Sequence, residues 1–202
     1  MRAVLLATRS AGKLSEIRPM FVSAGWTVRD LAESAIPEMP EEDTLEVFAT
    51  FEENARAKAR FFFAKSGGVP VVADDSGLEV AALSGAPGVM SKRWSNRPDL
   101  HGSALDETNN ALLLERLRGV RDRRARYVCA VVYWDGVQEV LARGVCDGRI
   151  ADDRARGAHG FGYDPYFFSD DLGRSFSDAT REEKATVSHR GRAIVSLLKS
   201  LR

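Results

Sequence analysis

The chain has 202 residues, of which 44% are apolar and 29% are charged, and its 29 basic and 29 acidic residues give a formal net charge of zero. This length suits one large domain, or two closely joined lobes, with a buried core. A neutral chain lacks the broad basic surface that nucleic acids or anionic membranes require, so any anion site must be built locally.

The cysteines and the apolar runs argue against a disulfide-rich, secreted or membrane-spanning protein. Two cysteines, Cys129 and Cys146, do not make a disulfide framework in a chain of this length, and we expect both to be reduced and buried. The N-terminal apolar run is too short for a signal peptide, and no run approaches the roughly 20 apolar residues of a membrane span. We therefore expect a cytoplasmic protein.

The predicted elements alternate along the chain. Strands are predicted at residues 3–7, 26–31, 69–73, 125–134 and 137–145, and helices at residues 13–24, 48–65, 104–117 and 188–201. Pro19 predicts a kink in the first helix or a late start to it. Residues 33–46 predict an acidic loop, and Asp135-Gly136 predicts a hairpin turn. This order is typical of an α/β protein with a mixed sheet and flanking helices.

The first candidate site is "ATRSAGK" at residues 7–13, between a strand and a helix. Small and polar residues there let backbone amides face an anion, and Lys13 adds a point charge. It is not a Walker A loop, because Ala7 and Leu14 stand where that motif needs Gly and Ser or Thr. A plain strand-to-helix connection is the alternative.

A second motif, "TFEENARAKAR", begins the helix that follows. Thr50 and Glu53 have the spacing of a capping box, which is a purely structural role. Asn54 and Lys58 are four residues apart and therefore share a helix face. They form either a polar pair in a site or a solvated pair.

The sequence "VVADDSGLEV" places Asp74 and Asp75 after an apolar strand. Ligand sites of open α/β sheets gather at the carboxyl ends of strands, and carboxylates there are the usual holders of Mg²⁺. The same residues, followed by Ser76, are also typical of a simple turn.

Two later motifs suggest a base and a phosphate site. In "HGFGYDPYFF", Phe161 or Tyr163 could stack on a flat ring and Asp164 could accept hydrogen bonds, or the loop could simply pack in the core. In "REEKATVSHRGRA", Ser188 predicts an N-cap, which puts His189 and Arg190 against the helix dipole. Such a mismatch favours an anionic ligand, and an exposed basic turn is the alternative.

Taken together, two acids, several cations and an aromatic loop are the parts of a Mg²⁺-dependent nucleotide hydrolase. The three histidines and two cysteines lack the spacing of zinc ligands. No Gly-x-Ser-x-Gly elbow supports covalent serine catalysis.

The sequence also resembles a known family, the inosine triphosphate pyrophosphatases, or Ham1 family. The matching motifs occur in the family's order and span residues 5–193: "LLATRSAGK", "TFEENARAKA", "ADDSGLEVAALSGAPGV", "GFGYDP" and "EEKATVSHRGRA". The resemblance implies an α/β fold with a long mixed sheet in two lobes around a central active-site cleft, usually as a homodimer. It also implies hydrolysis of ITP, dITP and XTP to the monophosphate and pyrophosphate with Mg²⁺.

The resemblance assigns roles by motif position. Asp75 would be the general base and a metal ligand, with Asp74 beside it and Glu46 as the third metal ligand; Glu41 and Glu42 remain alternatives to Glu46. The substrate-binding residues would be Thr8, Arg9, Ser10, Ala11, Gly12, Lys13, Asn54, Lys58, Ser76, Phe161, Gly162, Tyr163, Asp164, Lys184, His189 and Arg190. Of these, the lysines and Arg190 would face the triphosphate, and Phe161 to Asp164 with His189 would surround the purine.

Two positions depart from the family pattern. Ser10 stands where an Asn is usual, and a hydroxyl offers one donor where an amide offers two. Met90 stands where an aromatic residue is usual, which bears on local packing or the dimer contact.

Two competing functions remain open. A pyrophosphatase for standard or pyrimidine nucleotides would use the same phosphate machinery. A nucleotide-binding sensor without activity is disfavoured because Asp74 and Asp75 are both present.

Overall fold

The computed structural model describes residues 2–201 and contains one seven-stranded sheet with the order β2-β1-β3-β4-β5-β6-β7. β1 pairs parallel with β2 and β3, whereas β6 pairs antiparallel with β5 and β7. The sheet is therefore mixed, which confirms the α/β class. The strands are β1 (Ala3–Leu6), β2 (Thr27–Asp30), β3 (Val71–Val80), β4 (Arg124–Trp134), β5 (Glu139–Ile150), β6 (Phe167–Ser169) and β7 (Arg174–Ser175).

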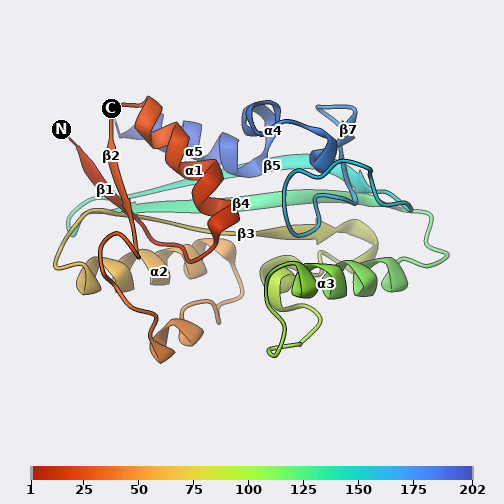
Figure 1. The fold of residues 1–202 in the computed structure, drawn as a ribbon, viewed down its shortest axis with the longest axis horizontal. Helices are drawn as coiled ribbons and strands as arrows, with labels where there is room; N and C mark the ends of the chain where they lie inside the picture. The colour runs from red at the N-terminus through yellow and green to blue at the C-terminus, as the bar shows by residue number, and fades with distance from the viewer. Residues whose placement is uncertain (1, 202) are drawn as a thin grey trace. The chain divides into compact units, whose positions relative to one another are not determined.

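Five α-helices within the described residues accompany the sheet (Figure 1). They are α1 (Ala11–Ser23), α2 (Phe51–Lys65), α3 (Gly102–Arg116), α4 (Arg181–Val187) and α5 (His189–Ser200). Short 3-10 helices are η1 (Pro40–Thr44), η2 (Ala81–Leu83), η3 (Gly88–Arg93) and η4 (Phe176–Asp178). No helix of residues 2–201 is long and apolar enough to cross a membrane.

The chain divides into two compact units. The first comprises Met1–Asp75, Cys129–Gly144 and Arg190–Arg202, and the second comprises Ser76–Val128 and Val145–His189. Each unit has its own apolar cluster.

In the first unit, alternation along the strands supplies two buried faces. Val4, Leu6 and Val72 pack with Ile17 and Phe21 of α1 and with residues of α5. Leu5 and Val71 are equally buried but point the other way, toward the face on which Figure 1 shows α2. A strand covered on both faces must be apolar throughout, which explains the continuous apolar runs.

The second unit is built on aromatic packing. Leu113 and Leu117, at the end of α3, pack with Leu78 and Val80 of β3. The rings of Tyr127, Phe167 and Phe176 lie against one another, with centroids 4.7 Å apart for Tyr127 and Phe167 and 5.0 Å apart for Phe167 and Phe176. Tyr163 and Phe167 of the aromatic loop motif belong to this same cluster.

Several predictions hold at the level of single residues. Both cysteines are reduced and buried. Thr50 caps α2 by accepting from the Glu53 amide at 3.2 Å. The turn at Asp135 joins β4 to β5, with the Asp135 carboxylate accepting from two backbone amides of the turn.

Other predictions were wrong. The most consequential concerns β3, which continues to Val80 instead of ending before Asp74. Asp74 and Asp75 therefore lie inside a strand, and the simple-turn alternative is excluded. Aspartate disfavours strands, but cationic partners in the folded protein override that preference.

The helices were also misjudged. α1 begins at Ala11 and continues through Pro19, so the expected late start is wrong. A separate helix, α4, precedes the closing helix, and the short strands β6 and β7 carry too few residues to show a pattern. Residues 33–46 form a loop as expected, apart from the single 3-10 turn of η1.

Candidate active site

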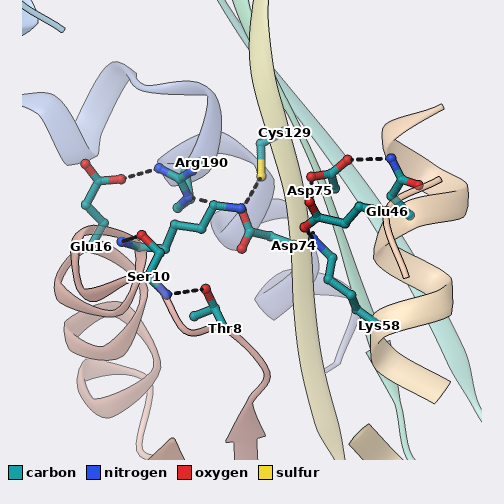
Figure 2. A network of polar contacts seen from close by, with 11 residues as sticks. Thr8, Ser10, Glu16, Glu46, Lys58, Asp74, Asp75, Cys129 and Arg190 are labelled. Atoms are coloured by element: carbon teal, nitrogen blue, oxygen red, sulfur yellow. Dashed lines mark hydrogen bonds and ion pairs between the residues drawn. The ribbon is translucent and has the colours of Figure 1, made fainter. Parts of the chain in front are cut away.

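The connection between β1 and α1 is organised by its own hydroxyls. Ser10 is the N-cap of α1 and accepts from the Lys13 amide at 3.3 Å. Thr8 Oγ1 accepts from the Ser10 amide at 3.2 Å, as Figure 2 shows. Serine thus serves the helix end at the position where the family pattern has asparagine, and Ala11 and Gly12 begin the helix.

Arg9, in the same connection, contacts the acidic loop. Its guanidinium donates to both oxygens of Glu42, at 2.7 and 3.1 Å, and to the carbonyls of Ile36 and Pro37 at 2.9 and 2.7 Å. Arg9 therefore fastens the acidic loop to the β1–α1 connection. Its predicted contact with substrate stays a prediction.

Asp74 lies in a buried cluster of cations (Figure 2). Lys13 Nζ lies 3.1 Å from its Oδ2, and Arg190 Nε lies 3.3 Å from the same oxygen. Burial acts to raise the pKa of Asp74, but the charges of Lys13 and Arg190 outweigh it and hold that pKa well below its usual range. Asp74 is thus ionised at neutral pH and contacts two cations.

The cluster extends through Arg190 to Glu16 on α1. Arg190 is 2% exposed, and its Nη1 donates to Glu16, whose charge opposes burial and raises the pKa of the guanidinium. The alternative of an exposed basic turn at Arg190 is therefore wrong. Sequence reasoning also missed Glu16, although it lies three residues after Lys13 and hence on the same face of α1.

Asp75 has a different set of partners, all toward α2. Asn54 Nδ2 donates to its Oδ2 at 2.9 Å, and Lys58 Nζ lies 3.4 Å from its Oδ1. Lys58 also donates to Glu46 Oε1 at 2.6 Å. The predicted helix-face pair of Asn54 and Lys58 is thus buried and points to Asp75, so the alternative of a solvated pair is excluded.

The electrostatics of this second cluster suit proton transfer. Burial raises the pKa of Asp75, and the nearby charge of Lys58 only partly opposes it. Burial acts to lower the pKa of Lys58, but Asp75 and Glu46 together raise it. A carboxylate with a raised pKa beside a fixed ammonium is a common feature of acid–base sites.

The same cluster fits a divalent cation. Asp75 and Glu46 both direct a carboxylate oxygen at one ammonium, so the two oxygens already face a shared positive charge. No group of three or more His, Cys, Asp and Glu side chains in residues 2–201 is arranged to hold a metal. Mg²⁺ suits this pair, since it commonly uses one or two carboxylates together with water and substrate phosphates.

Among the three candidate glutamate ligands for the metal, the contacts favour Glu46 over Glu41 and Glu42. Glu42 is held by Arg9, and Glu41 is exposed in η1. Glu46 is the one of the three that shares a partner with Asp75.

In the second unit, the loop at residues 160–164 is fixed from several sides. Asp164 Oδ2 accepts from the Phe161 amide at 2.8 Å and from Lys184 Nζ at 2.6 Å. The Tyr163 hydroxyl donates to the Ser91 carbonyl at 2.8 Å. Lys184 Nζ also lies 5.1 Å from the centroid of the Phe161 ring.

His189 and Ser76 complete the predicted residues of this unit. The ring of His189 stacks on Tyr127, with centroids 4.6 Å apart and planes 10° from parallel. Ser76 follows Asp75 in β3 and is half-buried. The structure therefore gathers Phe161, Tyr163, Asp164 and Lys184 in one cluster and sets His189 in the aromatic core.

Comparison with known proteins gives concordant matches. The Ham1 family profile matches residues 4–200. A dITP/XTP pyrophosphatase of Mycolicibacterium paratuberculosis is 48% identical over 100% of this chain and 96% of its own length, and one of Thermus thermophilus is 43% identical over 98% and 90%.

Solved structures agree with the sequence matches. The Ham1 protein of Coxiella burnetii superposes with a TM-score of 0.82 at 33% identity, covering 100% of this chain and 98% of that one. A nucleoside-triphosphatase, or dITP/XTP pyrophosphatase, of Mycobacterium abscessus superposes with a TM-score of 0.71 at 40% identity, covering 99% and 100%.

Proposed function

Since this chain belongs to the Ham1 family, we propose that it hydrolyses the purine nucleoside triphosphates ITP, dITP and XTP to the monophosphate and pyrophosphate. The relatives named dITP/XTP pyrophosphatase cover the chain from end to end, which supports this substrate class. The observation that carries the proposal is the buried arrangement in which Asp75 and Glu46 share Lys58.

In this proposal Asp75 is the general base. Its raised pKa favours taking a proton from water, while the Asn54 amide fixes one of its oxygens at 2.9 Å. The water oxygen bonds to the α-phosphorus, the bond between that phosphorus and the α–β bridging oxygen breaks, and pyrophosphate leaves. The proton of the water passes to Asp75.

Mg²⁺ held by Asp75 and Glu46 would neutralise phosphate charge and polarise the phosphate oxygens. Lys58 and Lys13 supply further positive charge from α2 and α1. Asp74 is better placed to orient Lys13 and Arg190 than to share the ion, because those two cations already contact its carboxylate.

Base selection belongs to the loop of residues 160–164 in this proposal. A pocket that hydrogen-bonds a 6-oxo purine rejects a 6-amino purine, whose donors would face donors. The amides of Phe161, Gly162 and Asp164 already donate within the protein, so in this proposal the Gly160 or Tyr163 amide supplies the donor for such a carbonyl oxygen. Standard or pyrimidine triphosphates are the second candidate substrates, since the phosphate machinery alone does not distinguish bases.

The decisive assay follows product release from ITP with Mg²⁺ present. Pyrophosphate in step with inosine monophosphate supports cleavage between the α- and β-phosphates, and free phosphate alone refutes it. A panel of ITP, XTP, GTP and ATP then tests base selection, which is contradicted by equal specificity constants for ITP and ATP. Omitting Mg²⁺, or replacing it by Ca²⁺, tests the metal.

A cytoplasmic homodimer is a further part of the proposal, supported by the likeness to the family. Met90, where the family has an aromatic residue, is 45% exposed in η3 and is a candidate for the contact between copies. Light scattering across protein concentrations tests the stoichiometry, and a monomer at micromolar concentration contradicts it.

A further inference from the structure

In the second unit, two side chains of α3, which carries none of the sequence motifs, contact Gly162 of the aromatic loop. Asp106 and Asn110 lie four residues apart on α3 and therefore share one face of the helix. Asp106 Oδ2 accepts from the Gly162 amide at 2.8 Å, and Asn110 Nδ2 donates to the Gly162 carbonyl at 2.9 Å. One helix face thus holds both backbone polar groups of a single loop residue.

Gly162 is the residue at which such a grip matters. Its φ is +62°, a left-handed conformation that only glycine adopts without strain. Rotation at this residue would swing the flanking peptides, and hence the Phe161 ring and the Asp164 carboxylate. Fixing both the amide and the carbonyl of Gly162 removes that rotation.

The chemistry of Asn110 argues against a purely structural role. The residue is 4% exposed, and its Oδ1 is buried without a hydrogen-bond partner among the described residues. A buried unsatisfied acceptor destabilises the folded protein, and an apolar side chain would avoid that cost. What the asparagine adds is the single donor that reaches the Gly162 carbonyl.

We propose that Asp106 and Asn110 are positioning residues that set base selectivity by holding Gly162, and with it the loop of residues 160–164, in one conformation. The inference rests on the proposed function, because it assigns these two side chains to the loop that reads the purine. They do not contact the substrate; they act through the Gly162 peptide groups. A loop held in this way keeps the Phe161 ring and the Tyr163 amide in place before the nucleotide arrives, which reduces the ordering cost of binding.

The test uses variants that alter the contacts with Gly162 and leave the clusters around Asp74 and Asp75 unchanged. Asn110→Asp replaces the donor by a carboxylate facing a carbonyl, and Asn110→Leu removes both polar groups at similar size. Asp106→Asn keeps an acceptor for the Gly162 amide, whereas Asp106→Leu does not. Glu107→Gln, an exposed neighbour on α3, is the control.

Each variant is characterised by kcat and KM for ITP, by kcat and KM for ATP, and by its affinity for pyrophosphate, measured by calorimetry. Both Asn110 variants and Asp106→Leu should lose about fivefold or more in kcat/KM for ITP, mainly through KM. ATP hydrolysis and pyrophosphate affinity should stay within about twofold, so that the ratio of ITP to ATP falls. Asp106→Asn, which keeps an acceptor, should lose much less kcat/KM for ITP than Asp106→Leu, and Glu107→Gln should match the wild type.

Several outcomes overturn the inference. Equal losses for ITP, ATP and pyrophosphate would show a general structural role, as would failure of Asn110→Leu to fold. Unchanged selectivity in folded variants would show that the grip on Gly162 does not matter. A wild type that releases no pyrophosphate from ITP refutes the proposed function and the inference together, whereas an active, selective wild type with indifferent variants refutes the inference alone.

Discussion

Asp74 and Asp75 are adjacent in the chain, yet their carboxylates have separate partners: Asp74 contacts Lys13 at 3.1 Å, and Asp75 accepts from Asn54 at 2.9 Å (Figure 2). Both residues lie inside β3, where successive side chains point to opposite faces of the sheet. The strand therefore divides two identical side chains between a cluster with α1 and a cluster with α2, and the two should respond differently to substitution.

Replacing Asp75 by Asn should abolish turnover and spare the fold. The substitution removes the proposed general base, which should lower kcat by about 10²- to 10⁴-fold, while Lys58 keeps Glu46 as its partner. Steady-state kinetics with ITP and a thermal melt measure the two effects. A variant that retains more than a tenth of the wild-type kcat would remove Asp75 from the role of base.

Replacing Asp74 by Asn should instead destabilise the protein. It removes the carboxylate that Lys13 and the buried Arg190 both contact, and breaking a buried ion pair costs about 3–5 kcal/mol. Urea unfolding compares this variant with Asp75→Asn as its matched control. Equal losses of unfolding free energy in the two variants would contradict the division of roles.

The lowered pKa of Asp74 predicts that the stability of the protein depends on pH. Asp74 stabilises the folded state above its ordinary pKa of 3.8, and this contribution is lost as the pH falls through its lower folded pKa. Unfolding free energies of the wild type should therefore decline more steeply below about pH 4 than those of Asp74→Asn. Parallel profiles for the two proteins would refute this linkage.

The pKa of Asp75 should respond in opposite directions to its two charged neighbours. Burial is the main cause of its elevation and the Glu46 charge adds to it, so Glu46→Gln should lower that pKa. Lys58 opposes the elevation, so Lys58→Met should raise it further. Carbon-13 NMR titration of the metal-free protein measures both, and shifts in the same direction would show that these charges are not the cause.

Two glycines of the loop offer a matched comparison. A Cβ at Gly160 would lie 2.1 Å from Asp164 Oδ2, whereas one at Gly162 has nothing within 4 Å, and both residues have positive φ. Gly160→Ala should therefore displace Asp164 and raise KM for ITP severalfold more than Gly162→Ala, whose cost is backbone strain of about 1–2 kcal/mol. The reverse order would mean that Asp164 is not held as described.

Arg9 should control the order of the acidic loop. Replacing Arg9 by Ala removes its contacts with Glu42 and with two carbonyls, so amides of residues 36–46 should exchange faster with solvent. Hydrogen exchange measures this, with the exposed Arg29→Ala as control. Unchanged exchange would show that the loop is ordered by other contacts.

The sequence predicted the candidate site better than it predicted the local backbone. The motifs selected Lys13 from a strand-to-helix connection, Lys58 from helix-face spacing, Asp75 from its place after an apolar run and Arg190 from its place at a helix start, and all four lie in the two buried clusters. The course of β3 through the two acids was not visible, since strand preference in a short segment is weak and the cations that neutralise it come from α1, α2 and α5.

By itself, the sequence determined the α/β class, the family and most residues of the two acidic clusters, since periodicity and motif order are properties of the chain alone. The tertiary structure decided which residues touch: that Glu16 backs Arg190, that Glu46 shares Lys58 with Asp75, and that Asp106 and Asn110 hold Gly162. These pairs lie 12 to 174 residues apart in the chain, and no local pattern encodes a contact at such separations. The tertiary structure also gives the neighbouring residues Asp74 and Asp75 different surroundings, because successive side chains of a strand point to opposite faces of the sheet.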